Sequence, residues 1–150
     1  MKCVAVFFVV ACASLQSTVV AQQADSIYSS LNQNPDNLAK IKELAVAANT
    51  LASSSPTEAV KLARRIIHLS ATLNSAEGQA IGYNELGNAF ERYSVYDSAF
   101  HYFFISHHLF AGMNSVEGRA DVLINIGNAH EIMGNYDSAA FYAFKALAFV

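Results

Sequence analysis

Five histidines are the first side chains of this sequence to consider for chemistry, because imidazole binds metal ions and exchanges protons near neutral pH. They are His68, His101, His107, His108 and His130. A helical metal pair needs two histidines four residues apart on one face, and no two of these have that spacing. His101 and His108 are separated by two helical turns, which is too far for one ion to bind both. We therefore expect neither a metal site nor a catalytic role for them.

Sequence motifs for other catalytic chemistry are also missing. The chain has no Gly-x-Ser-x-Gly elbow and no glycine-rich phosphate loop. Its carboxylates pair only at positions that suit helix capping. The sequence thus predicts a protein that is not an enzyme and that uses no cofactor.

One stretch of the chain occurs twice. The matching segments recur at an offset of about forty residues, the length of two short helices with their turns. They are residues 74–78 and 114–118, 86–89 and 126–129, and 96–99 and 136–139. A fainter copy upstream aligns residues 67–69 with 107–109. Self-similarity at this period predicts three stacked helical units and no β-structure.

Hydrophobic spacing and start signals outline the helices. A first stripe with steps of three and four residues begins at Leu38 and stops before Pro56. Its members are Leu38, Ile41, Leu44, Ala45, Ala48 and Leu51. Ser55, Pro56 and Glu58 then form a capping-box start for a helix that runs to about Leu73.

Capping signals also mark the helices of the two clear repeats. Asn74 and Asn114 each precede a glutamate by three residues, which predicts that they cap the first helix of each repeat. Asp97 and Asp137 are expected to cap the second helices, where an anion also suits the positive helix end.

Small residues indicate where two helices approach closely. Gly87 and Gly127 lie in helical context, although glycine costs about 1 kcal/mol of helix propensity relative to alanine. We expect Ala99 and Ala139 to supply the small surface that faces them.

Aromatic side chains crowd residues 100–110 and leave two interpretations open. Phe100, Phe103 and Phe104 are more than one helix face can bury without a neighbouring unit. Core filling between stacked helices is the favoured interpretation, and a pocket for a lipid or another small apolar molecule is the alternative.

The first 21 residues predict an export signal. Lys2 precedes an apolar run, and residues 19–21 fit the small-residue rule for signal peptidase. Cleavage would remove both cysteines, Cys3 and Cys12, and leave residues 22–37 as a flexible lead-in. The alternative is a lipoprotein anchored through Cys12. Otherwise, membrane attachment would require a membrane helix downstream of the sequence.

The charge of the chain argues against nucleic-acid binding. The formal net charge is -3, and Arg64-Arg65 is the only adjacent basic pair. Phosphate binding needs clustered Lys and Arg side chains. We expect this pair to be a solvated helix edge.

The repeat resembles the tetratricopeptide repeat. The resemblance rests on Leu86-Gly87, Tyr96 and Ala99, which recur as Ile126-Gly127, Tyr136 and Ala139. It is weaker in the first unit, where Ala47 replaces the glycine and Pro56 the tyrosine. It implies an all-α, right-handed superhelical solenoid of helix hairpins, with units at residues 38–73, 74–113 and 114–150. The long period is similar to exported sensor regions of Gram-negative bacterial signalling proteins.

The same resemblance implies a concave groove for a peptide partner, lined by the first helix of each unit. The expected groove residues of the two clear repeats are Asn84, Asn88, Glu91, Arg92, Ile124, Asn128 and Glu131, together with Ile81, Asp121 and Ile132. In the first unit they are Ile41, Leu44, Ala48 and Leu51. Asn88 and Asn128 match a family asparagine that grips a peptide backbone, since one amide both donates and accepts. Alternatively, these amides bond neighbouring helices, and Glu91 and Glu131 are solvated surface charges.

Two functions follow as expectations. The first is an exported, periplasmic or envelope-bound scaffold that binds a protein or peptide segment. The second is the sensor region of a larger protein whose histidine kinase or helix-turn-helix module lies beyond Val150. The last helix is apolar and lacks a polar cap, so we expect it to be covered by a later helix or another chain.

Overall fold

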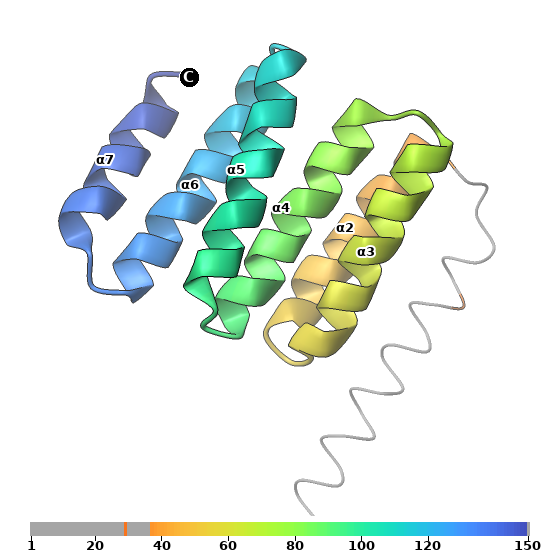
Figure 1. Ribbon diagram of the computed structural model, residues 1–150, viewed down its shortest axis with the longest axis horizontal. Helices are drawn as coiled ribbons and strands as arrows, with labels where there is room; N and C mark the ends of the chain where they lie inside the picture. The colour runs from red at the N-terminus through yellow and green to blue at the C-terminus, as the bar shows by residue number, and fades with distance from the viewer. Residues whose placement is uncertain (1–28, 30–36, 150) are drawn as a thin grey trace, which may run out of the picture. The chain divides into compact units, whose positions relative to one another are not determined.

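The computed structural model describes Ser29 and residues 37–149, and residues 37–149 form six α-helices (Figure 1). They are α2 (Leu38–Ala52), α3 (Pro56–Thr72), α4 (Ala76–Arg92), α5 (Tyr96–Gly112), α6 (Val116–Ile132) and α7 (Tyr136–Leu147). No strand occurs among the described residues, so the all-α prediction is confirmed for them. The predicted leader, residues 1–21, and most of the predicted lead-in lie outside the described residues.

Consecutive helices pack against each other throughout the compact unit Asp36–Val150. α2 also packs against α4, so helices of neighbouring hairpins are in contact as well. In Figure 1, α3 lies in front of α2 and α5 lies in front of α6. The largest fully buried apolar side chains come from α2, α3, α5 and α6, and they are Ile41, Leu44, Leu51, Leu62, Ile66, Phe103, Val122, Leu123 and Ile126. Burial along the whole row of helices is the main stabilising term.

The caps of α4 and α6 are serines, not the asparagines that the sequence predicted. Ser75 Oγ accepts from the backbone N–H of Gly78 at 3.0 Å, and Ser115 Oγ accepts from that of Gly118 at 3.3 Å. Asn74 instead turns the chain with φ 51°, and Asn114 does so with φ 54°. Asparagine tolerates this left-handed backbone better than most residues, so it occupies the turn position. The serine that follows it then becomes the N-cap.

The predicted aspartate caps of α5 and α7 are also wrong. The N-cap residues are Val95 and Asn135, and neither makes a side-chain capping hydrogen bond. Asp97 and Asp137 lie inside the first helical turn, where their charge faces the positive helix end. Ser55 is the N-cap of α3 as predicted, although its side chain makes no capping bond.

The two repeat glycines meet different neighbours. A Cβ on Gly87 would overlap the ring of Phe103, a fully buried side chain, so the ring packs directly on the glycine backbone. A Cβ on Gly127 would meet the carbonyl oxygen of Ala139 at 3.4 Å as its nearest atom. The expectation that alanine faces both glycines therefore fails for Gly87, because an aromatic ring takes that place.

Candidate functional site

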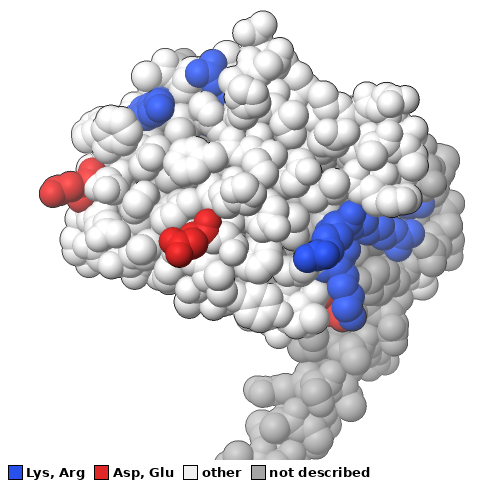
Figure 2. Space-filling model, viewed as in Figure 1, with Lys and Arg blue, Asp and Glu red and all other residues white. Residues whose placement is uncertain are grey.

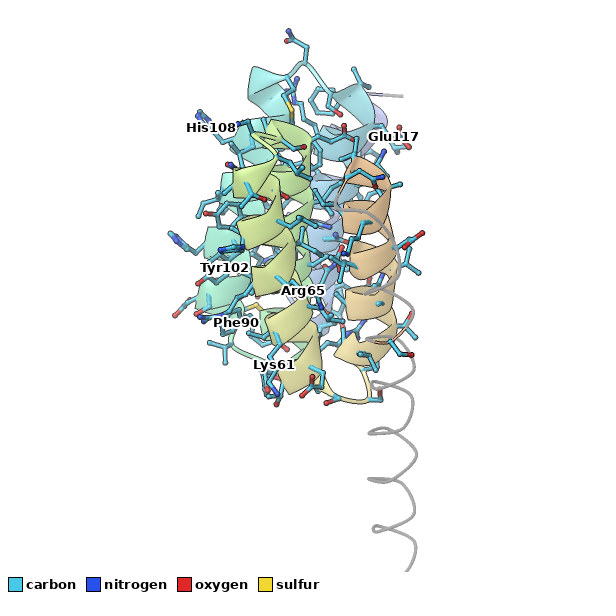
Figure 3. The ribbon with its side chains drawn as sticks, turned by 90° about the vertical axis from the view of Figure 1, so that its right-hand side faces the viewer. Lys61, Arg65, Phe90, Tyr102, His108 and Glu117 are labelled. Carbon is cyan, nitrogen blue, oxygen red and sulfur yellow. The ribbon has the colours of Figure 1, made fainter. Side chains whose placement is uncertain are left out.

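A hollow of about 320 Å³ lies where α2, α4 and α6 share one surface. It is lined by Lys42, Ala45, Glu77, Ile81, Asn84, Glu85, Phe110, Ser115, Glu117, Gly118, Asp121 and Val122. We call it the α2–α4–α6 groove. Figure 3 shows Glu117 on the side of the molecule where α2 lies and His108 on the opposite side.

Helical spacing explains how three helices present one lining. Lys42 and Ala45 are three residues apart on α2, and Ile81 and Asn84 repeat that step on α4. Residues with this separation project from the same helix face. The direct packing of α2 on α4 then places these faces side by side.

Glu85 is the most perturbed group in the groove. Its side chain is 8% exposed. Burial raises its pKa to about 7, and hydrogen bonds with Asn88 and Asn84 oppose that rise. The Asn88 amide donates to a carboxylate oxygen of Glu85 at 3.3 Å. Glu85 therefore changes charge near neutral pH.

Two further polar contacts order the groove. Asn125 Nδ2 donates to Asn84 Oδ1 at 3.0 Å and so joins α6 to α4. Lys42 Nζ lies 3.0 Å from a carboxylate oxygen of Glu77 and so joins α2 to α4. The Asn84–Asn125 bond is partly buried, whereas the Lys42–Glu77 pair is exposed at the surface.

The charge of the lining is predominantly negative. Glu77, Glu85, Glu117 and Asp121 contribute carboxylates, and Lys42 contributes the positive charge. Partial burial and the nearby Glu117 carboxylate raise the pKa of Asp121 above its usual value. Even with Glu85 neutral, the acidic groups outnumber the basic one, so the groove favours a cationic ligand.

The predicted groove residues of α4 have different surroundings. Asn84 lines the α2–α4–α6 groove, and Asn88 donates to Glu85 in the same helix. Glu91 is buried at 8% exposure, and burial raises its pKa against the opposing charge of Arg92. Their closest nitrogen and oxygen atoms are 3.8 Å apart.

Asp121 of the predicted α6 set lines the α2–α4–α6 groove, whereas Ile124, Asn128 and Glu131 lie in a second hollow. This hollow has a volume of about 290 Å³ and is lined by Ile124, Gly127, Asn128, Glu131, Tyr136, Ala139, Ala140 and Ala143. We call it the α6–α7 groove. The structure therefore divides the predicted set between two hollows, and Asn88, Glu91 and Arg92 line neither of them.

The groove positions predicted for the first unit are wrong. Ile41, Leu44 and Leu51 are fully buried, and Ala48 is 1% exposed. The helix face next to this apolar stripe lines the groove instead, through Lys42 and Ala45. Sequence reasoning also missed Glu85. Its position three residues before Asn88 was the available signal, because that spacing allows a carboxylate–amide bond.

Two of the histidines, His107 and His130, are half-buried, whereas His68, His101 and His108 are exposed. The His130 ring stacks between Phe100 and Tyr142, with ring centroids 4.6 and 5.4 Å away. Burial, followed by the positive charges of Arg119 and Lys145, lowers the pKa of His107. Among Ser29 and residues 37–149, no group of histidine, cysteine and acidic side chains has an arrangement that could hold a metal ion.

The face that α3 and α5 present in Figure 2 differs from the groove. Most of it is uncharged, with a larger group of Lys and Arg side chains at the right, further basic side chains at the upper left, and acidic side chains toward the left. Figure 3 places Lys61 and Arg65 on α3, away from Glu117.

Two further findings complete the description. None of the described helices has both the length and the apolar character needed to span a bilayer. Comparison of the chain with protein families, with curated proteins and with solved structures finds no match.

Proposed function

We propose that the chain is a non-enzymatic scaffold that binds a peptide segment of a partner protein in the α2–α4–α6 groove. One observation carries the proposal: three helices that are not consecutive in the sequence line a single hollow of about 320 Å³. The partly buried Asn84–Asn125 hydrogen bond orients a polar side chain that lines this hollow. Fixed donors and acceptors in a pre-formed hollow favour binding because little ordering remains to be done.

The charge of the lining favours a partner segment with a lysine or arginine side chain. Asp121 and Glu117 lie on the same part of α6, and the charge of Glu117 contributes to the raised pKa of Asp121. A cationic side chain between them would relieve this repulsion. Binding would then weaken with added salt, because charges near the surface are screened.

The wider setting of this proposal is a tetratricopeptide-like, right-handed superhelical array exported to the periplasm or cell envelope. Support for the array comes from the forty-residue repeat and from the packing of every helix on the next. Support for export comes from the apolar leader with its small-residue end at residues 19–21. The absence of catalytic motifs in the sequence supports a binding role over an enzymatic one.

The test is selection of a random-peptide display library on the immobilised full chain. Peptides with basic side chains should be enriched, and Asp121→Lys should weaken their binding about tenfold in calorimetry, or about 1.4 kcal/mol. Asp97→Lys is the matched control, because Asp97 is an exposed aspartate in α5 and lines neither groove. It should leave affinity unchanged.

Two outcomes would reject the proposed site. One is enrichment of peptides without basic residues whose affinity ignores Asp121→Lys. The other is equal loss of affinity in both variants, because the effect would then report overall charge and not the groove.

A further inference from the structure

Glu85 is a buried acid that also lines the α2–α4–α6 groove. Its side chain is 8% exposed, whereas Glu117 and Asp121 of the same lining are exposed. Within Ser29 and residues 37–149, no ion pair includes Glu85. An ionised carboxylate is costly to bury without a positive partner. The groove wall therefore carries an acid that no cation of the described chain neutralises.

Three asparagines orient this carboxylate. The Asn88 amide donates to Glu85 Oε2 at 3.3 Å, and Asn84 provides a second side-chain hydrogen bond. The Asn84 carbonyl oxygen itself accepts from Asn125 of α6 at 3.0 Å, which leaves its NH₂ group to donate to Glu85. The network thus presents an oriented acceptor at the place where α4 and α6 meet.

The two amides do not use all the binding capacity of the carboxylate. An ionised carboxylate has two oxygens with about four lone-pair sites. Asn84 and Asn88 are neutral, so they supply hydrogen bonds but no positive charge. An ammonium or guanidinium group supplies both, and such charge-assisted bonds are the stronger kind.

The helices that pack on α4 bring little positive charge toward Glu85. The other titratable side chains of the groove are Lys42 of α2, Glu77 of α4, and Glu117 and Asp121 of α6. Lys42 pairs with Glu77 at the surface. A cation from another molecule therefore meets an acidic groove in which the one basic side chain is already engaged.

α3 and α5 contact α4 through uncharged side chains. Ile66 and Ile67 of α3 lie against Gly82, and Phe103 of α5 lies against Gly87. The titratable groups that face Glu85 are thus those of the groove lining.

We propose that Glu85 is the residue of the α2–α4–α6 groove that selects a lysine or arginine side chain of the partner, and that it releases a proton as this side chain binds. The inference rests on the peptide-binding function proposed for the groove. In the bound state the Glu85 carboxylate pairs with the ammonium or guanidinium group, and the proton that it carried passes to solvent. The exposed Glu117 and Asp121 attract the cation, and the buried Glu85 discriminates against a neutral side chain.

This coupling makes binding depend on pH near neutrality. Burial raises the pKa of Glu85 to about 7, so roughly nine-tenths of the molecules carry the proton at pH 6 and one-tenth at pH 8. Affinity for a basic peptide should therefore rise about tenfold from pH 6 to pH 8, in proportion to the ionised fraction. A bound cation lowers the pKa of Glu85, so proton release accompanies binding at pH 6.

Calorimetric titration of the full chain tests the proposal. The probe is the tightest-binding basic peptide from the display selection, acetylated at its N-terminus and chosen without histidine so that it does not titrate. Measurements at pH 6 and pH 8, each in two buffers of different ionisation enthalpy, give both the affinity and the number of protons released. The tenfold rise should be seen with this peptide and be absent when its lysines and arginines are replaced by glutamine.

Glu85→Gln removes the titrating group and keeps the shape of the protonated acid. It should abolish the rise and the proton release, and its affinity at pH 8 should be no higher than that of the natural chain at pH 6. Glu91→Gln is the matched control, because Glu91 lies on the same helix, is also 8% exposed and lines neither hollow. The rise should persist in it, and circular dichroism checks that both variants remain helical.

The outcomes separate this inference from the proposed function. Equal affinity at both pH values, or a rise that survives Glu85→Gln, would overturn the role of Glu85 and leave the groove as the peptide site. Loss of the rise in Glu91→Gln would overturn that role as well, because the effect would then not be specific to the groove. Failure of every basic peptide to bind would reject the proposed function and this inference with it.

Discussion

The α4–α5 hairpin and the α6–α7 hairpin share their motifs but differ in packing. Both contain a glycine, an asparagine, a tyrosine and an alanine at equivalent positions: Gly87, Asn88, Tyr96 and Ala99, and then Gly127, Asn128, Tyr136 and Ala139. In the first hairpin, Phe103 fills the space over the glycine and α6 covers the pair. In the second, Ala143 leaves that space open as the α6–α7 groove.

This difference teaches that the shared motif is compatible with both a filled and an open hairpin surface, and that large side chains outside the motif, such as Phe103, fill the surface of the first hairpin. Phe103 and Ala143 occupy the same repeat position. A large buried ring contributes several kcal/mol through burial and packing, and an alanine contributes little. The α4–α5 region is therefore expected to hold more of the stability than the α6–α7 region.

The largest expected effect is from Phe103→Ala. It would convert the closed hairpin to the open form and lower the free energy of unfolding by about 3–5 kcal/mol, because the ring is fully buried. Phe104→Ala is the matched control one residue away, since Phe104 is 49% exposed. Chemical denaturation should show a much smaller change for it, and equal losses in both variants would contradict the comparison.

The second effect concerns a position that is acidic in one repeat and neutral in the other. Glu85 corresponds to Asn125, and burial raises the Glu85 pKa from 4.5 to about 7. The folded state binds the proton more tightly than the unfolded state. The stabilisation that the protonated Glu85 provides is therefore fully present below about pH 4.5. As the pH rises to about 7 this stabilisation is lost, and the free energy of unfolding falls by roughly 3 kcal/mol.

Glu85→Gln checks this expectation, because glutamine matches the shape of the protonated acid and does not titrate. Denaturation between pH 4.5 and pH 8 should show a flatter profile and higher stability at the alkaline end. Glu91 and Asp121 remain as smaller contributions of the same sign, since their pKa values are also raised. A profile as steep as that of the natural sequence would show that Glu85 is not the source.

The smallest effect separates the two glycines. Gly87→Ala should lower stability by about 1–2 kcal/mol, because crowding against Phe103 outweighs the gain in helix propensity. Gly127→Ala should raise stability by up to about 1 kcal/mol, because the nearest atom to its Cβ, Ala139 O, is 3.4 Å away. Thermal unfolding in dilute solution measures both. If Gly127→Ala lowered stability as much as Gly87→Ala does, the α6–α7 groove would not be open.

Much of the fold was predictable because helical spacing and small turn residues act locally. The all-α class and the hairpin period of the described residues were read from the sequence, and the end of α3 differs from its prediction by one residue. The N-cap residues of the helices were harder to predict. Asn74 and Ser75 can both cap a helix, and the choice depends on which of them takes the left-handed turn.

The grooves were less predictable because each depends on helices distant in the sequence. Periodicity placed Asn84 and Asn128 on similar helix faces, but α2 stands beside one and α7 beside the other. Periodicity also assigned the Ile41 stripe to the groove, whereas these side chains form the core. A helix has several neighbours in a packed array, and an amphipathic pattern alone does not say which neighbour covers its apolar stripe.

The sequence by itself determined the helices and their repeat, because turn chemistry and side-chain spacing act over a few residues. Tertiary structure decided which faces are buried, how Glu85 acquires its raised pKa, and why the α4–α5 surface is filled while the α6–α7 surface is open. These properties depend on which atoms surround a side chain, and those atoms belong to helices one or two elements away along the chain.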